Sequence, residues 1–232
     1  MVISLVKFYN IITSLLEQLD IFLKQTQTLF KKISNEILAY TLGLITADGS
    51  IGKNYEITIT LKQSDEILLK QINQQLLHGT GTIAYDNREN KKTYKLRFFG
   101  KQICENLKQY DVIPNKTYSL EKIQVFSEPI MKHYIRGLYD GDGICTKNKE
   151  YLRIGFCGYS KSFVESFQHY LVDTLQIKAN KIFKTSCWNC LWGAKKDLEI
   201  LYNYLYEDST IFLSRKKDKL QKYLYDNTEV TS

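Results

Sequence analysis

Thr41-Leu42-Gly43-Leu44-Ile45-Thr46-Ala47-Asp48-Gly49 recurs in related form as Ile135-Arg136-Gly137-Leu138-Tyr139-Asp140-Gly141-Asp142-Gly143, so one pattern, x-x-Gly-Leu-x-x-small-Asp-Gly, occurs twice. Asp48 and Asp142 lie 94 positions apart (142 − 48). In a helix, the small residues of each copy lie four positions apart on one face, Gly43 with Ala47 and Gly137 with Gly141. Because small residues let two helix backbones approach closely, the pattern predicts two helices packed through these four positions.

An Asp-Gly pair closes each predicted helix. We expect Gly49 and Gly143 to end the helices as left-handed caps, and Asp48 and Asp142 to lie in the last turns, where the helix dipole disfavours a carboxylate. Two acids brought together at such ends repel each other unless a cation lies between them. The alternative is that each Asp-Gly pair is a simple turn, but two copies in matching contexts favour a divalent metal site.

Both copies resemble the signature motif of the LAGLIDADG homing endonucleases, in the single-chain form with two motifs, and the resemblance covers residues 36–225. Thr41, Leu42 and Thr46 depart from the usual motif but leave both aspartates in place. The resemblance implies an α+β fold: two pseudo-twofold-related αββαββα repeats form a saddle of two antiparallel four-stranded sheets, joined by the paired motif helices. It also implies a divalent-metal-dependent DNA endonuclease that cuts both strands of a long asymmetric target, leaving four-base 3′ overhangs.

Composition agrees with an intracellular protein that binds nucleic acid. The chain of 232 residues has a net charge of +7 and a pI near 9.0, which favours an acidic partner. No stretch reaches the roughly 18 uncharged apolar residues of a membrane span, and the start fits neither a secretory signal nor a transit peptide. Five scattered cysteines fit a reducing compartment, and Cys187-x-x-Cys190 lacks a second ligand pair, which disfavours a structural zinc site. We expect a bacterial or phage cytoplasm or an organelle matrix.

The chain divides into four parts. Residues 1–34 read as an amphipathic helical extension, 35–112 as the first repeat, 113–127 as a linker marked by Pro114, and 128–232 as the second repeat with a C-terminal helix. Internal duplication is the simplest account of matching landmarks: Phe98-Phe99-Gly100 matches Leu191-Trp192-Gly193, and Pro114-Asn115-Lys116 matches Ser214-Arg215-Lys216.

Periodicity predicts the order of elements, and Asn35 is a plausible N-cap of the first motif helix. The expected helices are 36–48, 65–77, 101–110, 129–142, 160–175, 195–206 and 215–225. The expected strands are 55–62, 80–86, 93–99, 151–157, 180–186 and 187–193.

The resemblance implies that Asp48 and Asp142 hold two or three Mg²⁺ ions, which Mn²⁺ can replace; a ligand from the backbone at Ala47 is left open. It also suggests that Lys116 and Lys216, at matching positions, polarise the phosphate and order water. Gln63, with Tyr159 as its counterpart, is a weaker candidate. The alternative for each lysine is an ordinary phosphate contact or a solvated charge. Asp140 lies two positions from Asp142 and is interpreted as structural.

Alternating strands give each sheet one apolar face and one polar face. Curved strands fit the DNA major groove, where polar side chains reach base edges and lysines hold phosphates. A merely solvated sheet face is the alternative. The residues expected on the DNA-binding faces are Thr58, Thr60, Lys62, Lys95, Arg97, Tyr151, Arg153, Lys181 and Lys184.

The leading hypothesis is a monomeric homing endonuclease, encoded by a mobile intron or a free-standing element, whose partner is double-stranded DNA. A second possibility is a maturase that binds intron RNA, and a third is a DNA-binding protein that does not cleave. Retention of both aspartates favours cleavage over the third possibility, since a pure binder needs neither. We expect no membrane partner.

Overall fold

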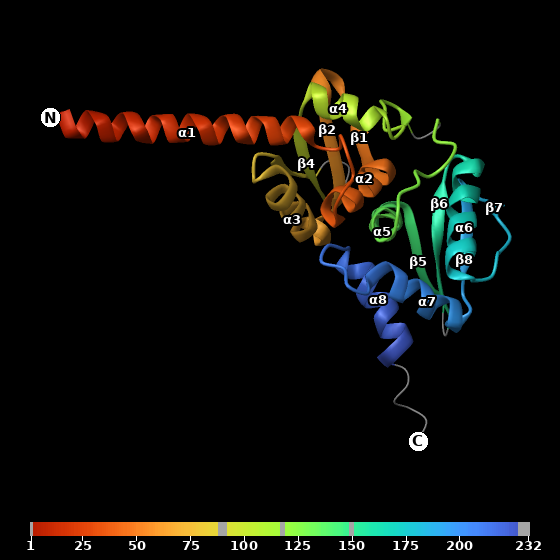
Figure 1. Cartoon of the computed structure of the whole chain (residues 1–232). Helices are drawn as coiled ribbons and strands as arrows, with labels where there is room; N and C mark the ends of the chain where they lie inside the picture. The colour runs from red at the N-terminus through yellow and green to blue at the C-terminus, as the bar shows by residue number, and fades with distance from the viewer. Residues whose placement is uncertain (1, 88–91, 117–118, 149–150, 227–232) are drawn as a thin grey trace.

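Two central helices organise the computed structural model, which describes residues 2–87, 92–116, 119–148 and 151–226 (Figure 1). Helices α2 (Glu36–Asp48) and α5 (Ile130–Asp142) are the predicted motif helices. A Cβ atom added at Gly43 would lie 2.2 Å from the carbonyl oxygen of Tyr134, and one added at Gly137 would lie 2.1 Å from that of Tyr40. The helix backbones are therefore in direct contact, which confirms the predicted packing.

The predicted packing extends to the last turns of the two helices. A Cβ atom added at Gly141 would lie 2.4 Å from the Cβ atom of Ala47. Any larger residue at Gly141 would separate the two helix ends that carry Asp48 and Asp142.

The helix ends differ from the prediction in their backbone conformation. Asn35 does cap α2, accepting a hydrogen bond from the Leu38 amide at 3.0 Å. Gly49 and Gly143, however, have φ angles of −84° and −72°, so the prediction of left-handed caps was wrong. The chain runs straight from each helix into a strand. Glycine is needed for space instead, because a Cβ atom at Gly143 would lie 2.0 Å from the carbonyl oxygen of Tyr139.

The first half forms a four-stranded antiparallel sheet in the order β1-β2-β4-β3. Its strands are β1 (Gly49–Ile51), β2 (Glu56–Lys62), β3 (Thr82–Asp86) and β4 (Thr93–Phe99). Helices α3 (Glu66–Leu77) and α4 (Lys101–Lys108) and the 3-10 turns η1 (Lys53–Tyr55) and η2 (Gln63–Asp65) complete it. Strand β1 is too short to show an alternating pattern, which is why periodicity did not predict it.

The second half repeats this plan in a sheet with the order β5-β6-β8-β7. Its strands are β5 (Gly143–Asn148), β6 (Tyr151–Gly158), β7 (Phe183–Lys184) and β8 (Trp188–Trp192). Its outer helices are α6 (Lys161–Leu175), α7 (Lys195–Tyr206) and α8 (Ser214–Tyr225). The strand expected over 180–186 is reduced to two residues. The repeated order confirms the α+β fold built from two αββαββα units.

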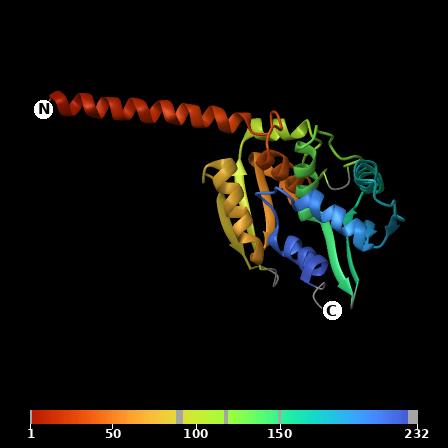
Figure 2. The same ribbon diagram turned by 60° about the horizontal axis from the view of Figure 1, so that its bottom comes forward.

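Alternation along the strands separates the core from the open faces. In β2, Ile57, Ile59 and Leu61 are buried, whereas the intervening residues are only partly buried or exposed. The two sheets lie on opposite sides of the α2–α5 pair (Figures 1 and 2). Helix α1 (Val2–Thr28) projects from this body as a long rod in both views. No helix within the described ranges has both the length and the apolar character needed to cross a bilayer.

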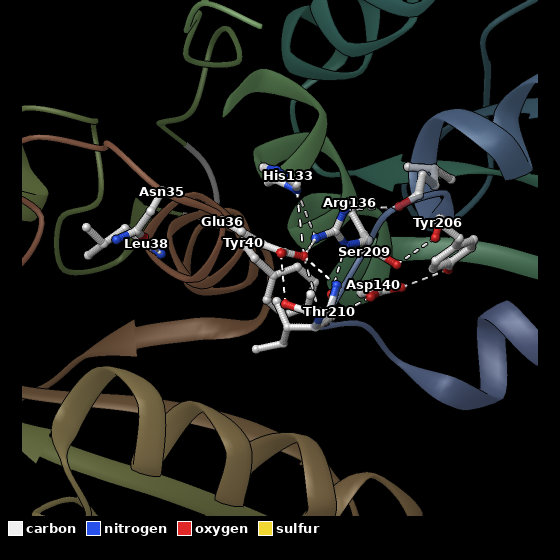
Figure 3. Close-up of polar contacts among 12 residues, drawn as sticks. Asn35, Glu36, Leu38, Tyr40, His133, Arg136, Asp140, Tyr206, Ser209 and Thr210 are labelled. Carbon is white, nitrogen blue, oxygen red and sulfur yellow. Dashed lines mark hydrogen bonds and ion pairs between the residues drawn. The ribbon is translucent and has the colours of Figure 1, made fainter. Parts of the chain in front are cut away.

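A buried polar network ties the two halves together beside α2 and α5 (Figure 3). Arg136 is completely buried and donates hydrogen bonds to the carbonyl oxygens of Ile211 at 2.8 Å and Leu205 at 3.1 Å. Its guanidinium also forms an ion pair with Glu36, across the boundary between the halves. The Glu36 carboxylate accepts a hydrogen bond from the Thr210 amide at 2.9 Å. Arg136 thus holds the loop before α8 against the first motif helix.

Asp140 belongs to the same buried region. Its carboxylate accepts hydrogen bonds from the Tyr40 hydroxyl at 2.8 Å, the Tyr206 hydroxyl at 3.0 Å and the Leu213 amide at 2.8 Å. These partners lie on α2, α7 and the residue before α8. The contacts agree with the structural role predicted for Asp140 and fix the point at which α8 begins.

Candidate active site at the ends of the motif helices

The last turns of α2 and α5 bring the two motif acids together. A Cβ atom added at Gly141 would lie only 3.6 Å from Oδ2 of Asp48, so the first carboxylate lies directly beside the second motif helix. Asp48 keeps an exposed surface and Asp142 is half-buried. Surrounding protein raises the pKa of both carboxyl groups, and the added charge of Asp48 contributes to a pKa of about 7 for Asp142.

Lys216, from α8, reaches the end of α5. Its ammonium donates to the carbonyl oxygens of Tyr139 at 2.7 Å, Asp140 at 2.9 Å, Gly141 at 3.2 Å and Gly143 at 2.6 Å. A helix leaves its last carbonyls without intrahelical partners, and a cation there opposes the negative end of the helix dipole. Lys216 therefore acts as a cationic cap of the second motif helix.

Lys116 holds the equivalent place in the first half. It is buried, and its ammonium donates to the carbonyl oxygen of Gly49, the counterpart of Gly143. Burial lowers the pKa of Lys116, and it lowers the pKa of Lys216 to about 8, although Asp48 and Asp142 oppose both shifts. The structure thus gathers two carboxylates and two ammonium groups, one of each from each half, as their matching sequence positions predicted.

Arg215, Asp65 and Cys157 also lie at this site, and sequence reasoning assigned none of them to it. Nε of Arg215 donates to both carboxylate oxygens of Asp65, at 3.2 and 2.9 Å, and the charges of both residues influence the pKa of Asp48. The Cys157 thiol donates to the carbonyl oxygen of Asp142 at 3.2 Å. The one available signal was that Arg215 immediately precedes Lys216.

Gln63 lies at the start of η2 with an exposed side chain. Among the contacts of the described residues, none joins this side chain to either acid. Strand register also corrects its predicted counterpart: Gly49 faces Ile59 in the first sheet and Gly143 faces Phe156 in the second. Counted from these pairs, Gln63 corresponds to Ser160, the N-cap of α6, so the match with Tyr159 was wrong by one position.

The donor set at the helix ends fits a hard divalent cation. Asp48 and Asp142 supply carboxylate oxygens from two helices, and Mg²⁺ commonly takes one or two carboxylates together with waters and substrate phosphates. Burial first, and then the negative charge of Asp48, raise the pKa of Asp142, and a bound cation would offset both effects. Within the described part of the chain, no group of three or more His, Cys, Asp or Glu residues could hold a metal without such external ligands.

The first sheet presents the predicted polar face. Register places Thr58 opposite Arg97 and Thr60 opposite Lys95, so these four side chains share one face, and they line a shallow groove there. Lys62 follows on the same face at the end of β2.

Acids accompany both cations on this face. The Lys95 ammonium lies 2.7 Å from the Asp86 carboxylate, and Nε of Arg97 lies 3.9 Å from that of Glu56. The groove therefore carries both acidic and basic side chains and is not uniformly basic. Carboxylates on such a face can accept hydrogen bonds from cytosine as readily as cations can donate to guanine.

The second sheet follows the prediction in part. Tyr151 and Arg153 are exposed on one face of β6. Lys184, however, pairs with Trp188 on the other face, and its ammonium lies 5.5 Å from the centre of the Trp188 ring. Placing Lys184 on the open face was therefore wrong, because β7 enters the sheet with Phe183 on that side. Lys181 is exposed in the segment before β7 and belongs to no strand.

Comparisons with known proteins agree with this architecture. Residues 35–110 match the family model of the LAGLIDADG-like domain. The fold is similar to that of the meganuclease I-AabMI bound to uncleaved DNA, with a TM-score of 0.55 and 15% identity over 82% of this chain and 89% of that one. The homing endonuclease I-LtrWI bound to target DNA gives a TM-score of 0.55 and 11% identity, covering 84% and 91% of the two chains.

The same fold also occurs in a protein that is not named as a meganuclease or a homing endonuclease. The N-terminal LAGLIDADG domain of WhiA matches with a TM-score of 0.55 and 15% identity over 84% of this chain and 93% of that one. No curated protein matches the sequence. Residues 35–110 therefore match a LAGLIDADG-like domain, and the two halves together have the fold of the LAGLIDADG meganucleases.

Proposed function

We propose that the chain is a site-specific DNA endonuclease that hydrolyses both strands of a long asymmetric target and leaves four-base 3′ overhangs. One observation carries the proposal: Asp48 and Asp142 meet at the ends of two helices, each with a buried lysine at the same relative position. A fold that only binds DNA does not need the paired acids. The relatives crystallised with DNA support duplex DNA as the partner.

Asp48 and Asp142 would hold two or three Mg²⁺ ions, or Mn²⁺ in their place. When bound, the ions would supply a water of lowered pKa and stabilise the charge that develops on the phosphate. The two carboxylates come from the two halves, so each half presents one acid to one DNA strand. Because the helix backbones touch at Gly43 and Gly137, the spacing of the acids cannot adjust independently.

The two lysines would serve the reaction differently. An ammonium group has three donors, and Lys216 has four carbonyl oxygens within 3.2 Å, so its donors are already engaged. Lys116 contacts one carbonyl among the described residues. Lys116 is therefore the better placed of the two to donate to a phosphate oxygen or to an attacking water, whereas Lys216 holds the end of α5.

The open sheet faces would follow the DNA grooves on either side of this centre. Thr58, Thr60, Lys95 and Arg97 lie where they can reach base edges, and Tyr151 and Arg153 extend the surface on the second sheet. Lys95→Ala or Arg97→Ala should weaken binding or relax specificity by about 1–3 kcal/mol if the side chain reads a base. An unchanged target preference in both variants would remove β4 from the interface.

A library of randomised duplex DNA, incubated with Mg²⁺ and then with EDTA, tests the proposal through the ends that are produced. We expect magnesium-dependent ends with four-base 3′ overhangs at one long sequence. Asp48→Asn should abolish cutting and leave duplex affinity largely intact, whereas the matched change Asp173→Asn, on an exposed surface of α6, should change neither.

Two other results would redirect the assignment. Specific duplex binding without cutting in the wild-type chain would assign a DNA-binding protein, the function class that the WhiA match keeps open. Absence of any selected duplex, together with tight binding of an intron RNA, would assign a maturase.

A further inference from the structure

Among the side chains that the structure describes, the hydrogen bonds between helix α1 and the body lie at the base of the helix. The Asn106 side-chain amide donates to the carbonyl oxygens of Gln27 at 3.0 Å and Leu29 at 2.8 Å, and the Gln109 amide donates to that of Phe30 at 2.9 Å. Beyond this clamp the helix extends away from both sheets (Figures 1 and 2). Its 27 residues correspond to a rod about 40 Å long at the usual helical rise.

The outer half of α1 exposes a run of large apolar side chains. All six are at least 40% exposed, and five of them exceed 55%: Phe8, Tyr9, Ile11, Ile12, Leu15 and Leu16. Together they offer on the order of 600 Å² of apolar surface per chain. In proteins, helices gain most of their stability by packing an apolar face against other parts of the structure. With its apolar side chains exposed to water, the outer half of α1 lacks this stabilisation.

These side chains form one continuous stripe. At 100° per residue they span about 160° of the helix circumference, from Ile11 through Leu15, Phe8, Ile12 and Leu16 to Tyr9. Polar residues occupy the opposite side, which carries Lys7, Asn10, Thr13, Ser14 and Glu17. The division is complete over residues 7–17, because no charged residue interrupts the apolar side.

The sequence spacing is that of a coiled coil. Phe8, Ile12 and Leu15 follow one another at intervals of four and three positions, as apolar residues do along the seam of a coiled coil. The positions that flank this seam, where coiled coils usually carry the charges that select a partner, are uncharged: Tyr9, Ile11 and Leu16. The charged residues Lys7 and Glu17 fall outside this seam and its flanks.

We propose that α1 is a self-association element that packs its apolar stripe against α1 of a second copy of this chain. An uncharged seam meets its own copy without like-charge repulsion, and it offers no charge by which a different helix could be selected. Two copies would bury on the order of 1,200 Å² of apolar side-chain surface, the lower bound for a stable interface.

The charge pattern disfavours the other surfaces that an amphipathic helix can bind. Helices that lie on membranes are rich in lysine and arginine on the polar side, whereas the sequence of α1 contains as many acids as lysines, two of each. Nucleic acid would require a basic stripe, and none is present here. Both motif acids lie in one chain, so the association joins two complete sites rather than building one. Under this proposal the chain is an oligomer, whereas the two motifs in one chain led us to expect a monomer.

Sedimentation velocity of the full chain across the micromolar range tests the proposal. We expect wild-type protein at no less than twice the 27.2 kDa of one chain. Ile12→Glu/Leu15→Glu, on the stripe, should reduce the mass to that of one chain. The matched control Asn10→Glu/Ser14→Glu adds the same two charges to the opposite side and should retain the wild-type mass.

Thermal unfolding should show the same midpoint for the body in all three proteins, because the substituted side chains lie on the exposed outer half of α1, away from the hydrogen bonds at its base. Wild-type protein that sediments as one chain throughout would overturn the proposal, as would an Ile12→Glu/Leu15→Glu variant that still associates. Single-chain wild-type protein that floats with phosphatidylcholine vesicles would assign the stripe to a membrane surface instead. The self-association of α1 is measured without any cleavage assay. If the chain proves not to be an endonuclease, the self-association proposal is therefore unaffected.

Discussion

Lys116 and Lys216 hold corresponding positions but differ in what surrounds their ammonium groups. Lys216 satisfies the carbonyls that end α5, whereas Lys116 contacts a single carbonyl among the described residues. The repeated sequence predicted that the two would correspond. It could not predict this difference, because hydrogen-bond partners depend on how far each lysine backbone lies from the helix end.

Exchange of each lysine for methionine should separate the two roles. Lys216→Met leaves several buried carbonyls without a donor, so we expect a lower free energy of unfolding, by on the order of 2–4 kcal/mol, together with lost cleavage. Lys116→Met should lose cleavage with a smaller loss of stability. Urea unfolding and cleavage assays on both variants measure the difference. Equal destabilisation would show that both lysines are mainly helix caps.

Asp142 should make the free energy of unfolding depend on pH. Its pKa of about 7 in the folded chain lies well above the value near 3.9 of an unfolded aspartate. Between these values the native chain holds a proton that the unfolded chain has released, so the native state loses stability as pH rises from about 4 to 7. Above pH 7 the full penalty is present.

Asp142→Asn should remove this penalty. In EDTA we expect the variant to be more stable than wild type at pH 8, by on the order of 2 kcal/mol, and to gain little at pH 4. Asp173→Asn, at an exposed position on α6, should change stability little at either pH. Chemical unfolding at the two pH values checks both statements. A gain of equal size at pH 4 would contradict the raised pKa.

At the scale of elements, alternation predicted which side of β2 and β4 is open, because a strand with period two must bury one side. The same rule failed at β7, where the expected seven-residue strand is only two residues long. Without the neighbouring strand, the sequence cannot define which of Phe183 and Lys184 faces outward. The sequence also could not predict the Arg215–Asp65 pair, because these residues are 150 positions apart and meet only through packing of α8 against the first half.

Asp86 should weaken DNA binding by the first sheet, because it pairs with Lys95 at 2.7 Å. Asp86→Asn should release the ammonium group and remove a charge that repels phosphate. We expect tighter duplex binding at low salt, with the slope of log K against log salt steeper by about 0.9 if one new phosphate contact forms. The measurement is a salt titration of duplex affinity.

Glu66→Gln is a matched control for Asp86→Asn, because it makes the same change of net charge on α3, where Glu66 pairs with Lys70. Its affinity should follow wild type closely. If both variants bind equally tightly, the gain comes from net charge alone, and Asp86 has no local effect on the groove.

For the whole molecule, the Glu36–Arg136 ion pair is one of the polar links between the halves (Figure 3). Arg136 lies within the second motif, but the resemblance assigns a role in the reaction to Asp142 alone among the motif residues there, so it does not reveal the role of Arg136. Its partners are the carbonyl oxygen of Leu205, in the last turn of α7, and that of Ile211, in the loop before α8. The sequence therefore predicted that two halves meet, whereas the polar contacts that hold them became visible only in the structure.

Arg136→Met should reduce the free energy of unfolding by on the order of 3–5 kcal/mol, because it leaves the Glu36 carboxylate without its buried cation. Arg153→Met, an exposed arginine on β6, should cost far less. The double variant Glu36→Gln/Arg136→Met should recover part of the loss, since no unpaired charge then remains. Urea unfolding of the three variants checks this, and a double variant no more stable than Arg136→Met would contradict it.

Lys216 is the last of the candidate active-site lysines and aspartates to be made during synthesis. The ribosome makes Asp48, Lys116 and Asp142 first, and Lys216 follows 74 residues after Asp142 (216 − 142). Until α8 emerges, α5 ends in carbonyls that lack their cation, and Asp140 has no Leu213 amide to hold. Under the proposed function, a nascent or prematurely terminated chain would carry both acids and still not cut the genome that encodes it.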